Sequence, residues 1–326
     1  MSNTKLKPLY LSDLFHKNTD SEHRVSVNEL VDMLEKLGIS AERKGLYRDI
    51  DALVEYGLDI KKTTSGYFLD KRKFSLAEIR ILISAVQSAS FISDKRTQEL
   101  VSKLMDYLSV YQAEAILQQS NIATVKNDNE EIFTIIEAVN IAISKCRRIS
   151  FSYYKRDLNR RDVIQRHGRR YRVSPYAMIW EQDKYYLVCN MDERDDLTHF
   201  RLDRMKNVRI EPMAWRHFSQ VSEYKSSFNI ADYARKCYNM YGGAVENVTL
   251  RCSNAILNDV FDRFGNDIIP KRDGMEHFIF SVKASVGIGL ISWISQFGEN
   301  IEIIAPDHLR SEMILRLNKM MSLYKS

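Results

Sequence analysis

Cysteine is scarce in this sequence, and its few copies lie far apart. The four cysteines are Cys146, Cys189, Cys237 and Cys252, and no two of them form a C-x-x-C pair. Structural zinc sites and disulfide frameworks both need cysteines at recurring short spacings. The sequence therefore predicts neither, and we expect all four side chains to be small buried hydrophobic groups.

Long apolar runs are also missing. No stretch approaches the roughly 18 consecutive apolar residues that a membrane-spanning helix needs. The N-terminal MSNTKLKPLY lacks an apolar segment of signal-peptide length. We therefore expect a cytoplasmic protein with no membrane partner.

Motifs for enzyme chemistry are absent as well. The sequence has no Gly-rich phosphate loop, no H-E-x-x-H and no G-x-S-x-G, and Gly287-Ile288-Gly289 is too short for a dinucleotide fingerprint. Serine, histidine and aspartate occur, but their spacing marks no catalytic triad. We expect no enzyme activity, no cofactor and no metal site.

What the sequence does have is a concentration of arginine among tyrosines. The 326 residues carry a net charge of only +5 and are 44% hydrophobic, enough for two or three domains with cores. Between 147 and 172, however, only Asp157 and Asp162 oppose a run of basic residues. These are Arg147, Arg148, Lys155, Arg156, Arg160, Arg161, Arg166, Arg169, Arg170 and Arg172. Positive side chains that contact phosphates, interleaved with aromatic rings on which bases stack, are typical of single-stranded nucleic acid binding. A solvated arginine-rich loop is the alternative.

Residues 1 to about 72 have the pattern of a small helical head. Ser26 and Glu29 form a capping box in front of an apolar stripe that ends at Gly38. Ser40 is placed to cap the next helix, which closes at Gly57. Two helices joined by a tight Gly-containing turn indicate a helix-turn-helix, although an ordinary helical hairpin has the same pattern.

The outward face of the second of these helices favours DNA binding. Stepping about 100° per residue from the apolar stripe at 46 to 53 places Lys44 and Arg48 outward, one turn apart. Asp51 and Glu55 occupy the same face further along, where they would repel phosphates. The N-terminal half should therefore approach DNA, as in helix-turn-helix docking.

Neighbouring residues support this interpretation. Ala41 and Gly45 lie on or beside the same face and are small enough to let a surface come close, while Arg43 and Tyr47 flank it. The alternative is a solvated charged face with ion pairs one turn apart.

The segment behind Gly57, LDIKKTTSGYFLD, indicates a β-hairpin that carries Lys61 and Lys62 on its first strand. The run that contains Tyr47-Arg48-Asp49, followed by Ser65-Gly66-Tyr67, resembles the winged helix-turn-helix of DeoR-type regulators. The resemblance implies DNA contacts from Arg43, Lys44, Tyr47 and Arg48, and a phosphate contact from Lys61 or Lys62. Phosphate contacts supply affinity rather than sequence preference.

Residues 75 to about 146 are helical by pattern. Ser75 and Glu78 form a second capping box, Asp94 begins a longer run, and a third helix at 132–144 follows a polar break at 127–131. We expect a connector that carries movement to the head, with dimer contacts as a further role.

Residues 171 to 210 predict a compact three-stranded meander behind a first strand, RRISFSYYKR. YRVSPYAMIW and KYYLVCN are rich in aromatic and β-branched residues, and polar turns separate them from each other and from THFRLDRM. Hydrogen-bond donors and aromatic rings are concentrated on these strands, which favours a binding surface. The alternative is that the arginines are ordinary surface residues and the tyrosines ordinary core residues.

Three elements in this order resemble the WYL domain: Ser174-Pro175-Tyr176, then Tyr185-Tyr186-Leu187, then Phe200-Arg201-Leu202-Asp203-Arg204, with Tyr185 where the family name has Trp. The resemblance implies an Sm-like β-barrel that senses a ligand in bacterial transcription regulators, with a basic pocket for nucleic acid or a nucleotide. It implies a ligand site of Arg172, Ser174, Tyr176, Tyr186, His199, Arg201 and Arg204.

Period-two alternation places Arg201 and Arg204 on opposite faces of their strand. Because the resemblance assigns both to one site, a bend or strand end near Asp203 is required. The planar fork of arginine donates two parallel hydrogen bonds and so suits a phosphate-bearing ligand. His199 is either a third donor or a structural histidine.

From Ala244 the order of elements is βαβ-like. Strands are expected at 245–252, 268–270, 276–284 and 300–304, and helices at 255–264, 288–297 and 308–324. This order predicts a small α/β sandwich and resembles the C-terminal extension domain that often follows WYL. The resemblance implies a homodimer in which this domain reaches across to the partner.

The expected fold is α+β and multidomain: a winged helix-turn-helix at 1–72, a helical linker at 73–146, a WYL barrel at 147–212 and the C-terminal α/β domain at 213–326. We expect a transcription regulator that binds double-stranded operator DNA and senses a nucleotide or single-stranded nucleic acid. The alternative is a nucleic-acid-binding accessory protein that acts through the WYL patch without regulating a promoter.

Overall fold

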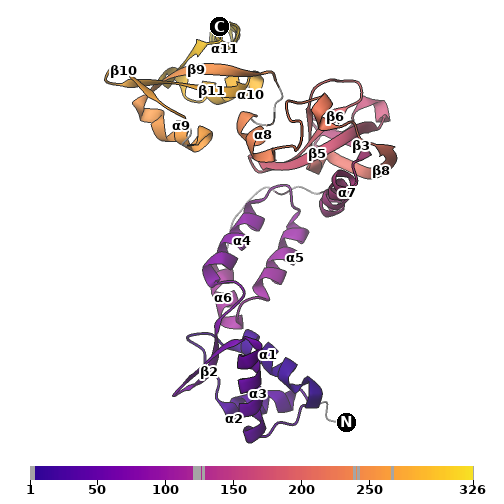
Figure 1. Cartoon of the computed structure of the whole chain (residues 1–326), viewed down its shortest axis with the longest axis vertical. Helices are drawn as coiled ribbons and strands as arrows, with labels where there is room; N and C mark the ends of the chain where they lie inside the picture. The colour runs from indigo at the N-terminus through magenta and orange to yellow at the C-terminus, as the bar shows by residue number, and fades with distance from the viewer. Residues whose placement is uncertain are drawn as a thin grey trace. The chain divides into compact units, whose positions relative to one another are not determined.

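The computed structural model describes residues 4–119, 126, 129–237, 240, 243–265 and 268–325. The chain forms two compact units, Met1–Glu130 and Glu131–Ser326, and each is described by itself. It is mixed α/β with several sheets, one of them half-barrel-like (Figure 1). Among the described helices, none is both long and apolar enough to cross a membrane.

The first unit begins with a head of three helices and a hairpin. Its elements are η1 Thr4–Leu6, α1 Lys7–Asn18, α2 Val27–Lys36, α3 Arg43–Tyr56, β1 Asp59–Thr63 and β2 Gly66–Lys71. The two strands pair antiparallel. Each helix buries an apolar stripe in one shared core, to which Leu11, Leu30 and Leu46 contribute fully buried side chains.

Local signals set most boundaries of the head. The capping box at Ser26 is confirmed, since its hydroxyl accepts from the Glu29 N–H and the Glu29 carboxylate accepts from the Ser26 N–H. Gly57 ends α3 at φ 114°, in the left-handed region that favours glycine. The predicted cap at Ser40 is wrong, because α3 begins only at Arg43 and the residue before it makes no side-chain capping bond.

Three helices follow the hairpin: α4 Leu76–Ser88, α5 Asp94–Met105 and α6 Val110–Gln119. The capping box at Ser75 is confirmed, and Ser93 caps α5. The helix start predicted at Asp94 is confirmed by α5, which ends at Met105, and the sequence analysis did not predict α6. The predicted polar break at 127–131 lies partly outside the described residues.

A buried carboxylate ties the head to α6. Asp20 is only 4% exposed; its Oδ1 accepts hydrogen bonds from the backbone of Glu22 and from the backbone and ring of His23. Its Oδ2 accepts from the Ser109 hydroxyl at 2.5 Å. Burial raises the pKa of Asp20, but these hydrogen bonds outweigh it and the net shift is downward. The His23 ring stacks on Tyr111 of α6, with centroids 3.6 Å apart.

The second unit opens with α7 Ile132–Ser144, which packs against β3, β5 and β8 of the first sheet (Figure 1). The strands of this sheet are β3 Arg147–Arg156, β4 Asp162–Ile164, β5 Tyr171–Glu181, β6 Lys184–Met191, β7 Thr198–Arg201 and β8 Met205–Ala214. Their order is β4-β3-β5-β6-β7, with β8 also paired to β3, and every pair is antiparallel. The predicted meander is confirmed as β5, β6 and β7. Its third strand is shorter than predicted, because β7 ends at Arg201 and the 3-10 turn η3 Leu202–Arg204 leads into β8.

The 3-10 turn η4 Phe218–Gln220 and α8 Ile230–Lys236 connect this sheet to a second one. The elements that follow are β9 Val245–Ser253, η5 Asn254–Ile256, α9 Leu257–Phe264, β10 Lys271–Asp273, β11 His277–Ser285, α10 Ile288–Ser295, η6 Gly298–Asn300, β12 Ile301–Ala305 and α11 Asp307–Tyr324. Alternation in β9 points Val248, Leu250 and Cys252 into the core of this part.

The second sheet has the order β10-β11-β9-β12, with antiparallel neighbours. The predicted βαβ order is present as split units, because β11 lies between β9 and β10, and β9 lies between β11 and β12. The strand predicted at 268–270 is wrong; β10 occupies 271–273 instead. Cys189, Cys237 and Cys252 are buried as expected, but Cys146 is exposed.

Candidate functional site

The N-terminal half of α3 exposes basic side chains. Arg43, Lys44 and Arg48 are exposed, whereas Leu46 and Ile50 on the opposite side are buried. Because the head buries the apolar stripe of α3, the opposite face remains in solvent. The outward direction predicted for Lys44 and Arg48 is confirmed.

Two small residues that were predicted to open this face lie elsewhere. Ala41 precedes α3. Gly45 is half-buried and faces α1, since a Cβ built on it would lie 3.5 Å from the Nζ of Lys7. That Nζ forms an ion pair with Asp49 Oδ2 at 2.7 Å. Gly45 therefore lies beside an internal ion pair, not on the exposed basic face.

The two lysines of the hairpin point in different directions. The Nζ of Lys62 lies 5.9 Å from the ring centroid of Tyr47 on α3 and 5.8 Å from that of Tyr67 on β2. Lys61 pairs instead with Asp59, two residues earlier on the same strand, at 2.7 Å. The hydrogen bond that Lys61 donates to this carboxylate raises the pKa of Lys61. Of the two, only Lys62 adjoins the basic face of α3.

A polar cavity of about 640 Å³ opens on the first sheet of the second unit. Its walls are Tyr153, Gln182, Tyr186, Arg194, Asp196, Leu197, Thr198, His199, Arg201, Arg204, Met240 and Gly243. The register pairs Tyr186 of β6 with Arg201 of β7, so both side chains lie on one face of the sheet. The volume lies within the range of roughly 300–1,000 Å³ typical of small-molecule sites.

The two arginines that were predicted to share a site both line this cavity. The strand end required near Asp203 is confirmed, because β7 stops at Arg201 and η3 turns Arg204 towards the same space. Arg201 donates from Nε and Nη2 to the two oxygens of Asp203, at 3.0 and 2.6 Å. Burial lowers the pKa of Arg201, but the bonds to Asp203 outweigh it and the net shift is upward. Arg204 is exposed and makes no hydrogen bond or ion pair with any residue that the structure describes.

His199 is held as a neutral group. Its Nε2 lies 2.7 Å from the hydroxyl of Tyr233 on α8, and it also bonds to the backbone of Met240. Burial lowers its pKa to about 4. At neutral pH the imidazole therefore carries no charge for a phosphate, and it connects the cavity wall to α8.

Ser174 and Tyr176, which were predicted in the same ligand site, do not line the cavity. The Ser174 hydroxyl accepts from the backbone N–H of Arg216 at 2.8 Å, and the Tyr176 hydroxyl donates to the Arg216 carbonyl at 2.6 Å. The Tyr176 ring packs against Trp215 and Phe218, and its burial raises its pKa. These two hydrogen bonds hold the segment that follows β8 against β5.

Arg172 also lies away from the cavity. Its neighbour Tyr171 stacks on Phe151 inside the sheet, with centroids 5.6 Å apart. Because successive side chains of a strand point to opposite faces, Arg172 projects from the other face, where it is exposed. Of the predicted ligand site, Tyr186, His199, Arg201 and Arg204 therefore line the cavity, whereas Arg172, Ser174 and Tyr176 do not.

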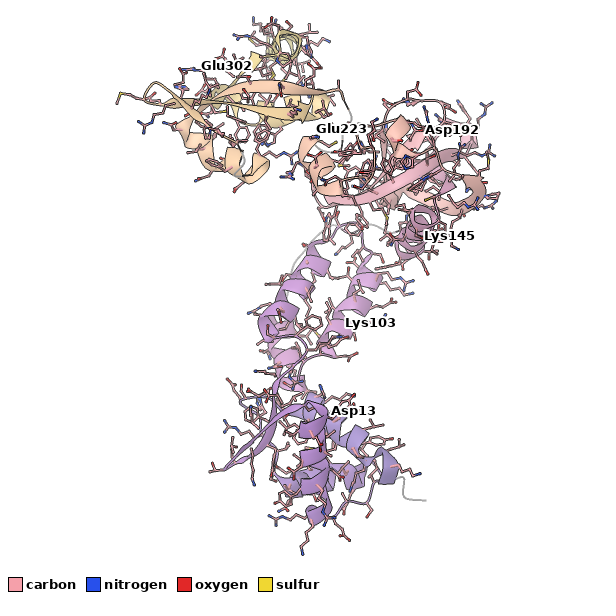
Figure 2. The ribbon with its side chains drawn as sticks, in the orientation of Figure 1. Asp13, Lys103, Lys145, Asp192, Glu223 and Glu302 are labelled. Atoms are coloured by element: carbon pink, nitrogen blue, oxygen red, sulfur yellow. The ribbon has the colours of Figure 1, made fainter. Side chains whose placement is uncertain are left out.

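Several arginines of the arginine-rich stretch make internal contacts. Arg148 donates to Asp192, which Figure 2 labels, at 2.5 Å, and Arg166 donates to Glu193 at 2.9 Å. Arg147 donates to the carbonyl of Pro212. These arginines fasten strands and turns, which leaves a smaller set available for an anion.

The sequence analysis did not predict several of the residues that line the cavity. Gln182 and Arg194 lie in the turns of the meander, which the sequence marked only as polar. Met240 and Gly243 come from the connection to the second sheet. A Cβ at Gly243 would collide with the Val286 carbonyl oxygen, so the close approach requires glycine. Among the described residues, no cluster of three or more His, Cys, Asp or Glu side chains is placed to hold a metal.

Two family models match parts of this chain. Residues 134–210 match the WYL domain, and residues 244–321 match the WCX domain. The WYL resemblance seen in the sequence is confirmed for the sheet that carries the cavity. Neither model covers the head.

One relative matches along nearly the whole length. It is an uncharacterized HTH-type transcriptional regulator, YobV, of Bacillus subtilis, which is 20% identical over 320 residues, covering 94% of this chain and 96% of the relative.

Two solved structures are also similar. Proteasome accessory factor B/C (PafBC) of Arthrobacter aurescens is 17% identical, with a TM-score of 0.29 over 99% of this chain. This chain spans 49% of the PafBC chain, about half of its length. A CRISPR Cas-related protein is 15% identical, with a TM-score of 0.38 over 76% of this chain and 72% of that one. At these values neither structure bears on the function.

Proposed function

We propose that this chain is a DNA-binding transcription regulator that binds operator DNA with its head and a ligand with its second unit. The observation that carries the proposal is the exposed basic half of α3, where Arg43, Lys44 and Arg48 face solvent. Lys62 of the hairpin stands beside this face. The matches to WYL and WCX domains and to a relative named as a transcriptional regulator agree with it.

In this proposal the head is a winged helix-turn-helix of the DeoR type. The N-terminal end of α3 enters the major groove and presents Arg43, Lys44, Tyr47 and Arg48 to the DNA. The hairpin β1–β2 is the wing, and Lys62 contacts a backbone phosphate. Partnership with DNA implies action in the cytoplasm.

The cavity of the second unit would bind a nucleotide or a short single-stranded nucleic acid. Arg201 is fixed in direction by Asp203, and Arg204 has no partner among the described residues, so the two offer planar donors to phosphate oxygens. Tyr153 and Tyr186 line the same space with rings that a base could stack on. The guanidinium groups suit the phosphate of a nucleotide, and the aromatic rings suit its base.

We further propose the division into a head at 1–72, a linker at 73–146, an Sm-like WYL barrel at 147–212 and a C-terminal extension domain at 213–326, in a homodimer. Support for the homodimer comes from α11, of whose residues only Leu309 is buried. Its Ile314, Leu317, Met321 and Tyr324 are exposed and follow each other at spacings of three and four. A stripe with this spacing is typical of a helix that packs on another helix.

The test is binding of the purified chain to duplex DNA from upstream of its own gene, compared with scrambled duplex and with single strands, across a salt series. Tight binding that prefers the upstream duplex is the expected result. Binding only to single strands, or equally to every duplex with a steep salt dependence, would instead support an accessory protein that does not regulate a promoter.

A further inference from the structure

The head and the linker helices α4, α5 and α6 meet at a polar contact. The apolar core of the head and the apolar cluster of the linker have no described residue in common. The contact instead joins Asp20 and His23, in the loop behind α1, to Ser109, which precedes α6, and to Tyr111 of α6. We name these four residues the polar joint. Hydrogen bonds depend on direction as well as distance, so a polar contact can fix the angle between two segments.

Asp20 is the centre of the polar joint. Its Oδ1 accepts hydrogen bonds within its own loop, whereas its Oδ2 accepts one from the Ser109 hydroxyl at 2.5 Å. A buried carboxylate is costly unless its hydrogen bonds are made, so separating the loop from α6 would leave Asp20 short of a donor. The buried charge therefore holds the loop and α6 together.

The linker side of the joint is built into the start of α6. The Ser109 hydroxyl accepts from the Gln112 N–H at 3.1 Å, and the Gln112 Oε1 accepts from the Ser109 N–H at 3.3 Å. This reciprocal pair is the pattern of a capping box. The Tyr111 ring of the same turn stacks on His23, with an angle of 6° between the rings. The direction of α6 is thus set against the loop of Asp20.

The head side of the joint extends to the hairpin. The Thr19 hydroxyl accepts from the Leu69 N–H of β2 at 3.0 Å. Arg72, directly behind β2, donates to the carbonyl of His16 at 2.7 Å and to that of Thr19. Both carbonyls lie at the C-terminal end of α1, where helical N–H partners run out. The hairpin is therefore tied to the loop that α6 holds.

We infer that the polar joint is a positioning element for DNA binding, which fixes the direction in which the linker holds the head and so sets the spacing of the two heads in a dimer. This role rests on the proposed function, because it needs DNA binding by α3 and a second copy of the chain. Dimeric helix-turn-helix proteins bind half-sites about one helical turn apart. A head that changes its angle moves its recognition helix out of register with its half-site. Asp20 and Tyr111 are positioning residues in this role and do not contact DNA.

The test compares variants on the two sides of the joint. Asp20→Asn removes the charge on the head side and keeps the shape of the side chain. Tyr111→Ala removes the ring that stacks on His23 from the linker side. Asp106→Asn is the matched control, because Asp106 is an exposed carboxylate of the linker outside the joint.

A footprint on the upstream duplex defines the two half-sites, and three duplexes are then compared by fluorescence anisotropy. They are the full site, one half-site alone, and the full site with about five base pairs inserted between the half-sites. The insertion turns one half-site to the opposite side of the double helix, because about ten base pairs make one turn. A head held at a fixed angle cannot follow this rotation.

The native chain and Asp106→Asn should prefer the full site over the inserted site at least roughly tenfold. In Asp20→Asn and Tyr111→Ala this preference should fall to about threefold or less, while the affinity for the half-site stays within about twofold of the native value. A reduced preference at unchanged half-site affinity separates a positioning role from a folding defect of the head. The same preference in all proteins, or an equal loss on the half-site, would overturn the inference.

A second measurement needs no DNA. Cys146→Ser removes the exposed native thiol, since the other three cysteines are buried. Spin labels are attached through Asp13→Cys on α1 and Lys103→Cys on α5, two exposed positions that Figure 2 labels. Pulsed electron paramagnetic resonance should give one narrow distance distribution, which Asp20→Asn should broaden.

The two measurements separate this inference from the proposed function. Distributions that are equally broad with and without Asp20→Asn would overturn the inference even in a chain that binds its upstream duplex. A native chain that binds no upstream duplex would overturn the proposed function, and the role in DNA binding with it, whatever the distance distribution.

Discussion

Arg201 and Asp203 form a two-bond ion pair at the point where β7 ends and a 3-10 turn begins. The carboxylate side chain is 2% exposed, whereas the guanidinium reaches the cavity. Arg204, one residue further, lies at the same cavity without a partner among the described residues. One arginine is therefore part of the framework of the site, and the other is available to a ligand.

Arg204→Gln should weaken nucleotide binding and leave stability unchanged, whereas Arg201→Gln should reduce both. The first change breaks no internal contact, so the free energy of unfolding should stay within about 0.5 kcal/mol. The second removes the ion pair of a buried carboxylate and should cost about 3 kcal/mol. Calorimetric titration with mononucleotides and urea unfolding measure the two effects. Equal stability of both variants would contradict the framework role of Arg201.

The basic half of α3 should carry DNA binding. Lys44→Ala/Arg48→Ala should reduce the affinity for upstream duplex at least about tenfold, because each contact to phosphate or base contributes on the order of 1 kcal/mol or more. The control is Lys17→Ala/Lys103→Ala, which removes the same charge from exposed positions of α1 and α5; Lys103 is labelled in Figure 2. Unchanged affinity in the first variant would contradict the proposed recognition helix.

The two hairpin lysines should differ in the same assay. Lys62→Ala should weaken duplex binding several-fold, since this lysine stands beside Tyr47 of α3. Lys61→Ala should have little effect, because Lys61 points to the other side of the strand, where it is already paired with Asp59. Because each variant removes one positive charge, each serves as the charge control for the other. A larger effect from Lys61 would place the wing in another orientation on the DNA.

Features of the first unit that depend on neighbouring residues could be predicted from the sequence. The capping boxes at Ser26 and Ser75 and the end of α3 at Gly57 involve groups within four residues of each other. The exposed direction of Lys44 follows from helical periodicity alone. The start of α3 could not be predicted so well, because a residue suited to capping at Ser40 is not used.

Features of the ligand site that depend on distant segments could not be predicted. Nothing near Tyr176 in the sequence indicates that its hydroxyl binds the carbonyl of Arg216, forty residues later. The outward direction of Arg172, away from Tyr171, follows from alternation, but only once Tyr171 is known to face the core. Met240 enters the cavity from a connection whose path depends on the fold of the whole unit.

The exposed stripe of α11 should mediate self-association. Leu317→Glu/Met321→Glu should convert a dimer to a monomer in analytical ultracentrifugation, because burying two carboxylates in an apolar helix contact costs several kcal/mol. Leu315→Glu is the control, since Leu315 is also exposed but lies on a different side of the helix. An unchanged dimer in the double variant would place the interface elsewhere.

His199 should make the second unit less stable in mild acid. Its pKa is lowered from 6.5 to about 4 by burial, so the unfolded chain binds a proton between these values and the folded chain does not. The stabilisation is complete above pH 6.5 and is lost as the pH falls towards 4; between pH 7.5 and pH 5 the loss is about 2 kcal/mol. All three tryptophans, Trp180, Trp215 and Trp293, lie in this unit, so their fluorescence reports its unfolding in urea. His199→Gln cannot titrate and should lose about 2 kcal/mol less than the native chain over the same interval. An equal loss in both proteins would mean that His199 is already protonated in the folded state at pH 5, and that its bond to Tyr233 does not require the neutral ring.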